Sequence, residues 1–379
     1  MSATFVFGLS ALLHFYIGAR LVHELPAPAS WLLAGWLVVS TVLMPMGMAA
    51  RRFLSGARAE RVAIAGLLAM GLFSSLLVGT FLRDVLLIGF GVVHTFAPLA
   101  FPFSTLERLS AELVPAAALA VTVIGFANAR RIARVVEVRV PIAGLPAGLD
   151  GFTIAQISDV HVGPTIRREY VQGIVDAVNR IDADIIAITG DLVDGSVAQL
   201  REHVAPLAQL KARHGVFFVT GNHEYYSGAL PWMAELRRLG ITVLHNGHAV
   251  LEHAGEQLVV AGVPDYSAGH FHDDHASDPA RSLQGAPAHA KKVLLAHQPR
   301  TAPAAARAGF DLQVSGHTHG GQFWPWNHFV RLQQPYTAGL HKLDGLWVYV
   351  SRGTGYWGPP KRFGAPSEIT RLSLRPASA

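Results

Sequence analysis

A change of composition near residue 130 divides this chain into two parts. Residues 1–129 are almost entirely apolar with isolated charges, whereas residues 130–379 have the balance of a water-soluble protein. An apolar block of this size indicates a membrane region followed by a soluble one. We therefore expect a transmembrane region over 1–129, a linker with the first strand over 130–149, and a soluble domain over 150–379.

Four stretches of the first part are long enough to cross a bilayer as helices, which takes about 20 apolar residues each. They cover approximately residues 4–22, 30–50, 62–82 and 110–129. The first has no basic start and no small-residue cleavage site, so we interpret it as a retained span and not as a signal peptide.

Residues 85–103 are also apolar, but Arg83 and Asp84 precede them, and Pro98 and Pro102 interrupt them. We expect an interfacial or re-entrant piece here, with a fifth span as the alternative.

Arginine is concentrated in RRFLSGARAER, which follows the second predicted span, and in RRIARVVEVR, which follows the last. The HELPAPA stretch between the first two spans has no Lys or Arg. The positive-inside rule then places both Arg-rich stretches in the cytoplasm, as an even number of spans requires. We expect a multi-pass protein of the bacterial inner membrane whose soluble domain faces the cytoplasm.

Composition also excludes some chemistry. The chain has no cysteine, which rules out disulfides and thiolate metal ligands. Its net charge of +5 comes mostly from arginine near the apolar segments, and no basic run interleaves with aromatics. We expect a lipid bilayer as a partner and no nucleic acid.

In the soluble part, short runs rich in Val and Ile alternate with stretches of helical spacing, a pattern typical of an α/β layered domain. We expect buried strands over 152–158, 184–190, 215–221, 258–263, 292–297 and 311–316. We expect helices over 167–180, 197–211 and 230–239. The later part is richer in strands, which predicts a mixed sheet with a second sheet packed on it.

Most of these strands end in polar residues. The clusters at the strand ends contain Asp159, His161, Asp191, Asn222, His223, His297, His317 and His319. Ligands of α/β sheets bind outside the carboxyl ends of the strands, so clusters distant in sequence can converge on one point.

The residue types in these clusters indicate a metal site. Carboxylate and amide oxygens mixed with imidazole nitrogens suit Mn, Fe or Zn and suit Ca poorly. Two divalent ions need about this many ligands, including one carboxylate that bridges them. The glycines before Asp191, Asn222 and His317 allow sharp turns and close approach of a phosphate.

The ordered series DxH, GDxxD, GNHE, H and GHxH resembles the calcineurin-like metallophosphoesterase superfamily over roughly residues 150–375. The resemblance implies a mixed β-sandwich flanked by helices. It implies one metal held by Asp159, His161 and His319 and another held by Asn222, His297 and His317. Asp191 would bridge the two ions, His223 would be the general acid, and Asp194 would orient its imidazole.

Two features refine this resemblance. Gly195 stands where the Ser/Thr phosphatases of the superfamily carry arginine, which argues against a phosphoprotein as the substrate. The segments GHTHGGQFWPW and SRGTGYWGPPKRFGAPSEI look like the bacterial membrane-associated branch, which includes a UDP-2,3-diacylglucosamine hydrolase. The expected activity is hydrolysis of a phosphodiester or pyrophosphate bond in a lipid-linked or nucleotide-linked substrate, with manganese favoured.

Other interpretations remain open at this point. Arg352 and Arg362 could clamp a substrate phosphate or be solvated loop charges. The GHFHDDH run at 269–275 is expected to be a surface or lid segment. A periplasm-facing phosphodiesterase of envelope lipids is one alternative for the whole chain, and a non-catalytic membrane scaffold with a relic metal domain is another.

Overall fold

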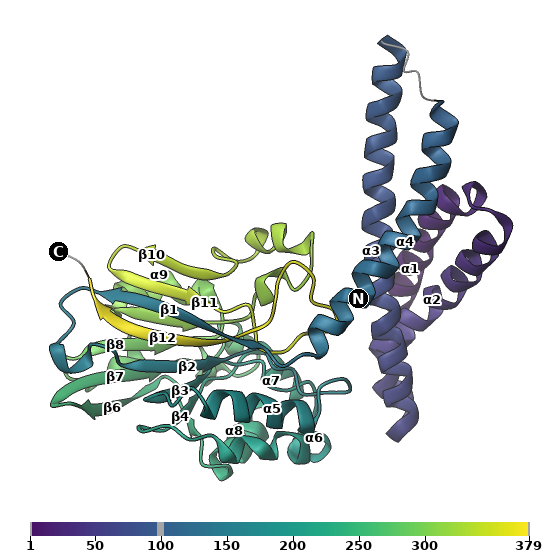
Figure 1. The fold of residues 1–379 in the computed structure, drawn as a ribbon. Coiled ribbons are helices and arrows are strands. Elements are labelled where there is room, and N and C mark those ends of the chain that lie inside the picture. The colour runs from purple at the N-terminus through teal and green to yellow at the C-terminus, as the bar shows by residue number, and fades with distance from the viewer. Residues whose placement is uncertain (1, 97–101, 378–379) are drawn as a thin grey trace. The chain divides into compact units, whose positions relative to one another are not determined.

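The structure is a computed structural model that describes residues 2–96 and 102–377. The chain divides into two compact units. One contains Met1–Arg130 with Gly358–Lys361, and the other contains Arg131–Trp357 with Arg362–Ala379 (Figure 1).

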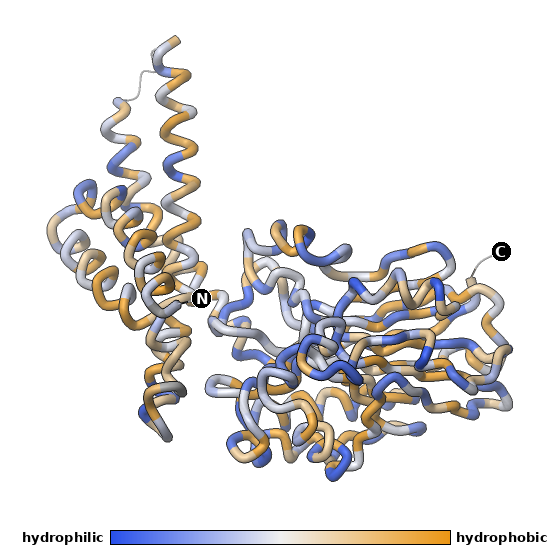
Figure 2. Tube along the Cα trace, turned by 180° about the vertical axis from the view of Figure 1, so that it is seen from behind, coloured by the Kyte–Doolittle hydropathy of each residue, from blue (hydrophilic) through white to orange (hydrophobic). Residues whose placement is uncertain are grey.

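The first unit is built from four long helices, and all four are long and apolar enough to cross a membrane. They are α1 Ala3–Leu21, α2 Ala27–Phe53, α3 Gly56–Phe96 and α4 Phe103–Arg130. Figure 2 shows apolar residues along most of their length, and large side chains such as Trp31 and Leu32 are exposed. Exposed apolar surface of this kind matches a lipid environment.

Helices α2 and α3 approach each other closely at two glycines. A Cβ added to Gly47 would lie 2.6 Å from Cα of Gly66, nearer than any side chain could pack. Small residues at such crossings let helix backbones approach closely in a membrane.

The separate interfacial piece expected over residues 85–103 is wrong for the described part, because residues 85–96 continue α3 without a break. The bundle accommodates the charges that suggested a break. Arg83 is buried and donates to Ser110 Oγ and to the Glu107 carbonyl oxygen, both at 2.9 Å. Asp84 accepts from Arg20 Nε at 3.0 Å. Residues 97–101, which include Pro98, lie outside the described residues.

The second unit is an α/β domain with two mixed six-stranded sheets, as the sequence predicted. The first sheet has the order β1-β12-β2-β3-β4-β5. Its strands are β1 Arg134–Ile142, β2 Thr153–Ile157, β3 Ile185–Ile188, β4 Val216–Phe218, β5 Thr242–Val243 and β12 Glu368–Pro376. Apart from the antiparallel β12–β2 pair, its neighbours run parallel.

The second sheet has the order β10-β11-β9-β8-β7-β6, with parallel pairing from β11 to β7 and antiparallel pairs at both edges. Its strands are β6 Gly247–His253, β7 Glu256–Gly262, β8 Lys291–Leu295, β9 Leu312–Ser315, β10 Gly339–Leu343 and β11 Leu346–Val350.

The main core lies between the two sheets. Ile154, Ile185 and Phe217 of the first sheet are in one buried cluster with Val260, Val293 and Val314 of the second. These strands are buried on both faces, which explains their nearly continuous apolar runs.

Helices cover the outer faces of the sandwich. α9 (Ala302–Ala308) packs on the second sheet through Ala302 and Ala305. Figure 1 shows α5 (Arg168–Asn179), α6 (Val197–Val204) and α8 (Ala229–Arg238) together beside the first sheet. All three fall within or beside the helices expected from the sequence.

Candidate metal centre

Residues with left-handed backbone conformation mark the strand ends where the expected ligands lie. Five of the expected ligands have φ between 50° and 71°, a region that non-glycine residues rarely adopt. They are Asp159, His161, Asp191, His317 and His319. Strain held at one place by the surrounding fold is typical of functional sites.

Glycines beside the expected ligands leave room for neighbouring ligand side chains, a role that the sequence interpretation did not assign to them. A Cβ at Gly221 would overlap the Asp191 carboxylate, and a Cβ at Gly316 would overlap Asp159. Two of the strand-end loops can therefore approach closely only with glycine at these positions.

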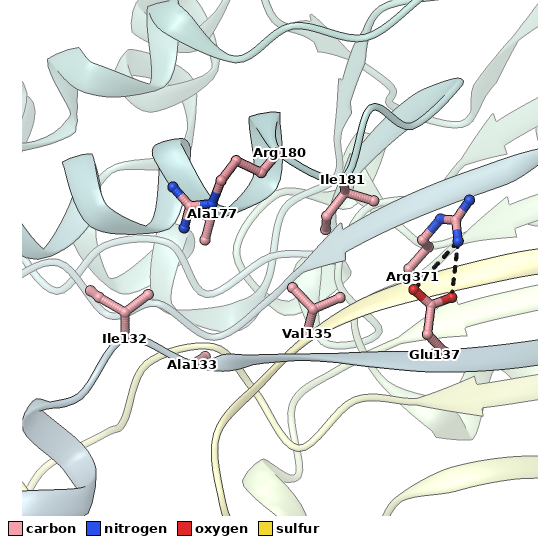
Figure 3. A pocket seen from close by; sticks show the side chains of 8 residues that line it. All are labelled: Ile132, Ala133, Val135, Glu137, Ala177, Arg180, Ile181 and Arg371. Atoms are coloured by element: carbon pink, nitrogen blue, oxygen red, sulfur yellow. Dashed lines mark hydrogen bonds and ion pairs between the residues drawn. The ribbon is translucent and has the colours of Figure 1, made fainter.

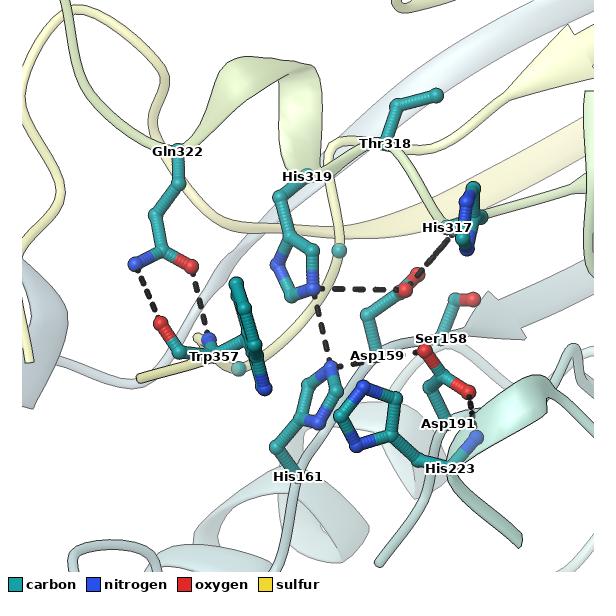
Figure 4. A network of polar contacts seen from close by, with 12 residues as sticks. Ser158, Asp159, His161, Asp191, His223, His317, Thr318, His319, Gln322 and Trp357 are labelled. Atoms are coloured by element: carbon teal, nitrogen blue, oxygen red, sulfur yellow. Dashed lines mark hydrogen bonds and ion pairs between the residues drawn. The ribbon is translucent and has the colours of Figure 1, made fainter. Parts of the chain in front are cut away.

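The first ligand cluster joins the ends of β2 and β9. Asp159, His161 and His319 offer ligand atoms that lie within 4.8 Å of one another. The Nε2 atoms of His161 and His319 are 3.0 Å apart, and Nε2 of His319 is 3.5 Å from Asp159 Oδ1 (Figure 4).

The second cluster joins the ends of β3, β8 and β9. Asp191, His297 and His317 offer ligand atoms within 4.8 Å of one another. Oδ2 of Asp191 is 3.1 Å from His297 Nε2 and 3.9 Å from Nε2 of His161, a member of the first cluster. Asp191 therefore lies between the two clusters, and its expected bridging role stays a prediction.

Hydrogen bonds and burial prepare two of these imidazoles for a cation. His297 donates from Nδ1 to the Thr189 carbonyl oxygen at 2.7 Å, which directs Nε2 toward Asp191, where a cation would take the place of the hydrogen shared with the carboxylate. Burial and the neighbouring His297 lower the pKa of His317 to about 3, so its ring is neutral at physiological pH.

Asn222 supplies a direct test of whether these residues fit a metal. It is the first residue of α7 (Asn222–Ser227), and its Oδ1 atom is buried with no hydrogen-bond donor among the described residues. A buried amide oxygen without a donor is costly, and a cation satisfies it. The donor set of oxygens and imidazole nitrogens is also one that Mn, Fe or Zn accepts.

Asp194 contacts two histidines with one oxygen. Its Oδ1 accepts from Nδ1 of His223 at 2.6 Å and from Nδ1 of His161 at 3.0 Å. The family resemblance implied the contact with His223 and not the contact with His161. Burial would lower the pKa of His223, but the hydrogen bond to Asp194 and the Asp191 carboxylate outweigh it and raise the pKa to about 9.

Glu224 is a part of the site to which the sequence interpretation assigned no role. It is fully buried, and its carboxylate accepts from the backbone N–H groups of Gly221, Asp191 and Leu192 at 2.7, 3.0 and 2.8 Å. It thereby joins the loop after β4 to the loop after β3. Burial and the Asp191 carboxylate raise the pKa of Glu224 to about 7, against the effect of these donors.

Both arginines expected near a substrate phosphate have partners in the protein. Arg352 forms an ion pair with Glu368 at 2.9 Å, while its side chain remains 39% exposed. Arg362 is buried, and its Nη1 atom donates to the carbonyl oxygens of His319 and Arg352, both at 2.8 Å. These contacts favour a positioning role for Arg362 and leave Arg352 as the candidate for a substrate contact.

The guanidinium of Arg362 also reaches the ring of His319, with Nη2 3.1 Å from Nδ1. With Arg362 donating, the neutral ring carries its hydrogen on Nε2. A cation bound through Nε2 requires this hydrogen bond to open and the hydrogen to move to Nδ1.

Exposed aromatic side chains surround His223. Its ring centroid lies 5.2 Å from that of Tyr226 and 5.9 Å from that of Trp357, and Phe271 lies 5.7 Å beyond Tyr226. All three aromatic side chains are exposed. Gln322 holds the Trp357 backbone through two hydrogen bonds of 2.8 Å (Figure 4). We call Tyr226, Phe271 and Trp357 the aromatic wall.

The GHFHDDH segment is folded against this region. His275 is buried, and its Nδ1 atom lies 2.8 Å from the hydroxyl of Tyr225 on α7. The neighbouring His272 is exposed.

A pocket of about 600 Å³ opens elsewhere in this unit, between β1 and the end of α5 (Figure 3). An ion pair of 3.2 Å between Arg371 and Glu137 closes one side. None of its lining residues belongs to the ligand clusters, so the pocket is separate from the metal centre.

Comparison with known proteins agrees with this geometry. Residues 152–321 match the family model for calcineurin-like phosphoesterases, a range that contains every expected metal ligand and excludes Arg352 and Arg362. The chain is 40% identical over 280 residues to a transmembrane protein with metallophosphoesterase domain from Bos taurus, covering 70% of this chain and 63% of that protein. A protein of the same name from Danio rerio is 39% identical over 263 residues, covering 67% of this chain and 60% of that one.

An uncharacterized metallophosphoesterase from Aquifex aeolicus is 34% identical over 244 residues. That alignment covers 64% of this chain and 92% of the bacterial protein. By contrast, this chain spans only about three fifths of the length of the two animal relatives.

Proposed function

This chain belongs to the calcineurin-like metallophosphoesterase family, and we propose that it is a membrane-anchored enzyme that hydrolyses a phosphodiester or pyrophosphate bond in an amphiphilic substrate. The observation that carries the proposal is the pair of ligand clusters on either side of Asp191, with His223 beside them. The membrane anchor is the set of four apolar helices.

The residues proposed to hold one divalent ion are Asp159, His161 and His319. Asn222, His297 and His317 would hold the other, with Asp191 between the two, and manganese is the favoured ion. Bound there, such ions would neutralise charge on the phosphoryl oxygens and lower the pKa of water in the site.

His223 is proposed to protonate the oxygen of the leaving group. Asp194 accepts from its Nδ1 atom, which leaves Nε2 as the atom that can deliver a proton. A carboxylate in this position fixes both the tautomer and the orientation of the ring.

The aromatic wall supports an amphiphilic substrate. A leaving group that receives its proton from His223 would lie against Tyr226 and Trp357. Exposed aromatic rings stack on a nucleobase or pack on an apolar chain, and they contribute little to binding a small hydrophilic alcohol. UDP-2,3-diacylglucosamine carries both kinds of group and is the substrate that we would test first.

Arginine placement supports a cytoplasmic catalytic domain. The stretches RRFLSGARAER and RRIARVVEVR flank predicted spans, and basic residues near span ends remain on the cytoplasmic side. A reporter enzyme that is active only in the periplasm, fused after Ala379, distinguishes this orientation from a periplasmic domain acting on envelope lipids. We expect no reporter activity, because the cytoplasmic orientation keeps the reporter in the cytoplasm.

The test of the activity is a substrate series on detergent-solubilised full-length protein, with manganese present and after chelation. We expect hydrolysis of bis-p-nitrophenyl phosphate and UDP-2,3-diacylglucosamine, and loss of that hydrolysis with chelator or with Asp191→Asn. Activity on phosphomonoesters or phosphoproteins alone would contradict the substrate class. Absence of both metal binding and hydrolysis would support a scaffold with a relic domain.

A further inference from the structure

A second group of metal-ligating side chains lies at the other end of the strands that carry the metal centre. Asp184 immediately precedes β3, His214 lies two residues before β4, and His253 is the last residue of β6. The catalytic ligands follow the carboxyl ends of β3 and β4, whereas this group is at their amino ends. It also joins the two sheets, because β6 belongs to the second.

The three side chains offer ligand atoms within 4.8 Å of one another. Nε2 of His214 is 3.0 Å from Nδ1 of His253, and Nδ1 of His253 is 3.8 Å from Oδ1 of Asp184. These separations are close to those between neighbouring ligands of one ion that has bonds of about 2.0–2.2 Å.

Contacts on the far side of each group hold the arrangement in place. Oδ2 of Asp184 accepts from the backbone N–H and the hydroxyl of Thr153 at 2.8 and 2.9 Å, which directs Oδ1 toward His253. The buried ring of Phe152 lies 6.0 Å from the ring of His214 and 5.0 Å from that of His253. Ligands fixed in this way need little rearrangement when an ion binds.

The two imidazoles share one hydrogen in this arrangement, since two ring nitrogens 3.0 Å apart cannot both carry one. An ion between them would take the place of this hydrogen, which would move to the outer nitrogen of the ring that carried it.

We propose that Asp184, His214 and His253 bind one divalent ion of the zinc class, which ties the two sheets together at the end remote from catalysis. Two imidazoles and one carboxylate, with a position open to water, form a donor set that Zn²⁺, Co²⁺ and Ni²⁺ accept. One group competes with the ion, because the exposed guanidinium of Arg213 lies 3.4 Å from Asp184 Oδ1.

The test measures bound zinc per chain by equilibrium dialysis on full-length protein in detergent after chelator treatment. We expect the His253→Gln variant to bind about one ion fewer than the wild type, and zinc to raise its apparent Tm less. Hydrolysis of bis-p-nitrophenyl phosphate with manganese should be unchanged, so this result is independent of the proposed activity. His341→Gln, on β10 of the second sheet, is the control and should match the wild type.

Arg213→Ala provides a test that leaves all three ligands intact. Removal of the competing cation should lower the zinc concentration for half-saturation by about threefold to fivefold. Equal zinc content in the wild type and His253→Gln would overturn the proposal. If His253→Gln does not fold, an unchanged half-saturation in Arg213→Ala overturns it instead.

Discussion

The Nδ1 atom of His223 lies 2.6 Å from Oδ1 of Asp194, the same oxygen that accepts from His161. One carboxylate thus orients both the proposed general acid and a proposed metal ligand. Loss of this carboxylate should therefore affect proton transfer and metal binding together, whereas loss of His223 should affect proton transfer alone.

His223→Gln should reduce kcat by about 100-fold on a diester with an alkyl leaving group, since such an alkoxide needs a proton. The reduction should be much smaller on bis-p-nitrophenyl phosphate, because p-nitrophenolate leaves without one. Steady-state kinetics on both substrates check this prediction. Equal losses on the two substrates would show that His223 does not act as the acid.

Asp194→Asn should lower kcat on the alkyl diester by about 100-fold and should also weaken manganese binding by about tenfold. The second effect follows from the loss of the acceptor for His161 Nδ1. Manganese titration of activity measures it, with the exposed Asp176→Asn on α5 as the control. Unchanged manganese affinity would mean that Asp194 serves His223 only.

Glu224→Gln should lower the apparent Tm by at least about 4 °C, because the amide presents N–H donors to a ring of backbone N–H donors. The loops carrying Asp191 and Asn222 should then separate, so manganese affinity should also fall. Thermal unfolding followed by circular dichroism checks the first effect. Glu169→Gln on the exposed side of α5 is the matched control, and a similar Tm in both variants would contradict the role of Glu224.

Arg362→Gln and Arg352→Gln should behave differently. The first removes the side-chain donor to the carbonyl oxygens of Arg352 and Gly355 and should lower the apparent Tm by at least about 5 °C. The second leaves the buried Glu368 carboxylate with its donors from the Tyr349 hydroxyl and the Arg352 backbone N–H, so it should lower Tm less than Arg362→Gln does while raising KM. An unchanged KM in Arg352→Gln would leave neither arginine as a phosphate contact.

His245 should make the stability of the second unit sensitive to acid. Burial lowers its pKa to about 4, and His275, 4.2 Å away between ring centroids, adds to this effect. Arg237 and Arg281 act in the same direction, and Asp274 opposes them. The unfolded chain therefore binds a proton more readily than the folded one, so stability should fall as pH drops from about 6.5 to 4.

In His245→Gln, the apparent Tm should fall by about 2–4 °C less over this range than in the wild type. The exposed His289→Gln should keep the wild-type slope. Parallel Tm curves for the wild type and His245→Gln would contradict the assignment to His245.

Residue types and their spacing determined much of this protein. The apolar block of residues 1–129 requires helices that suit a membrane, and the runs rich in Val and Ile predict strands buried on both faces. The polar residues at the ends of those strands could be proposed as ligands of one site, because the ends of neighbouring parallel strands meet at one edge of a sheet. Their chemistry could be read before any contact was known.

Tertiary structure decided what depends on contacts between segments far apart in the chain. The continuation of α3 past Arg83 depends on acceptors in other helices, and the burial of Arg362 depends on carbonyl groups in distant loops. Glu224 belongs to the GNHE motif, but its contacts, like those of Asp184, His214 and His253, depend on the folded backbone that brings their partners within reach. Local pattern specifies which face of a strand is apolar, whereas the direction and partners of a single polar side chain are set by the packing around it.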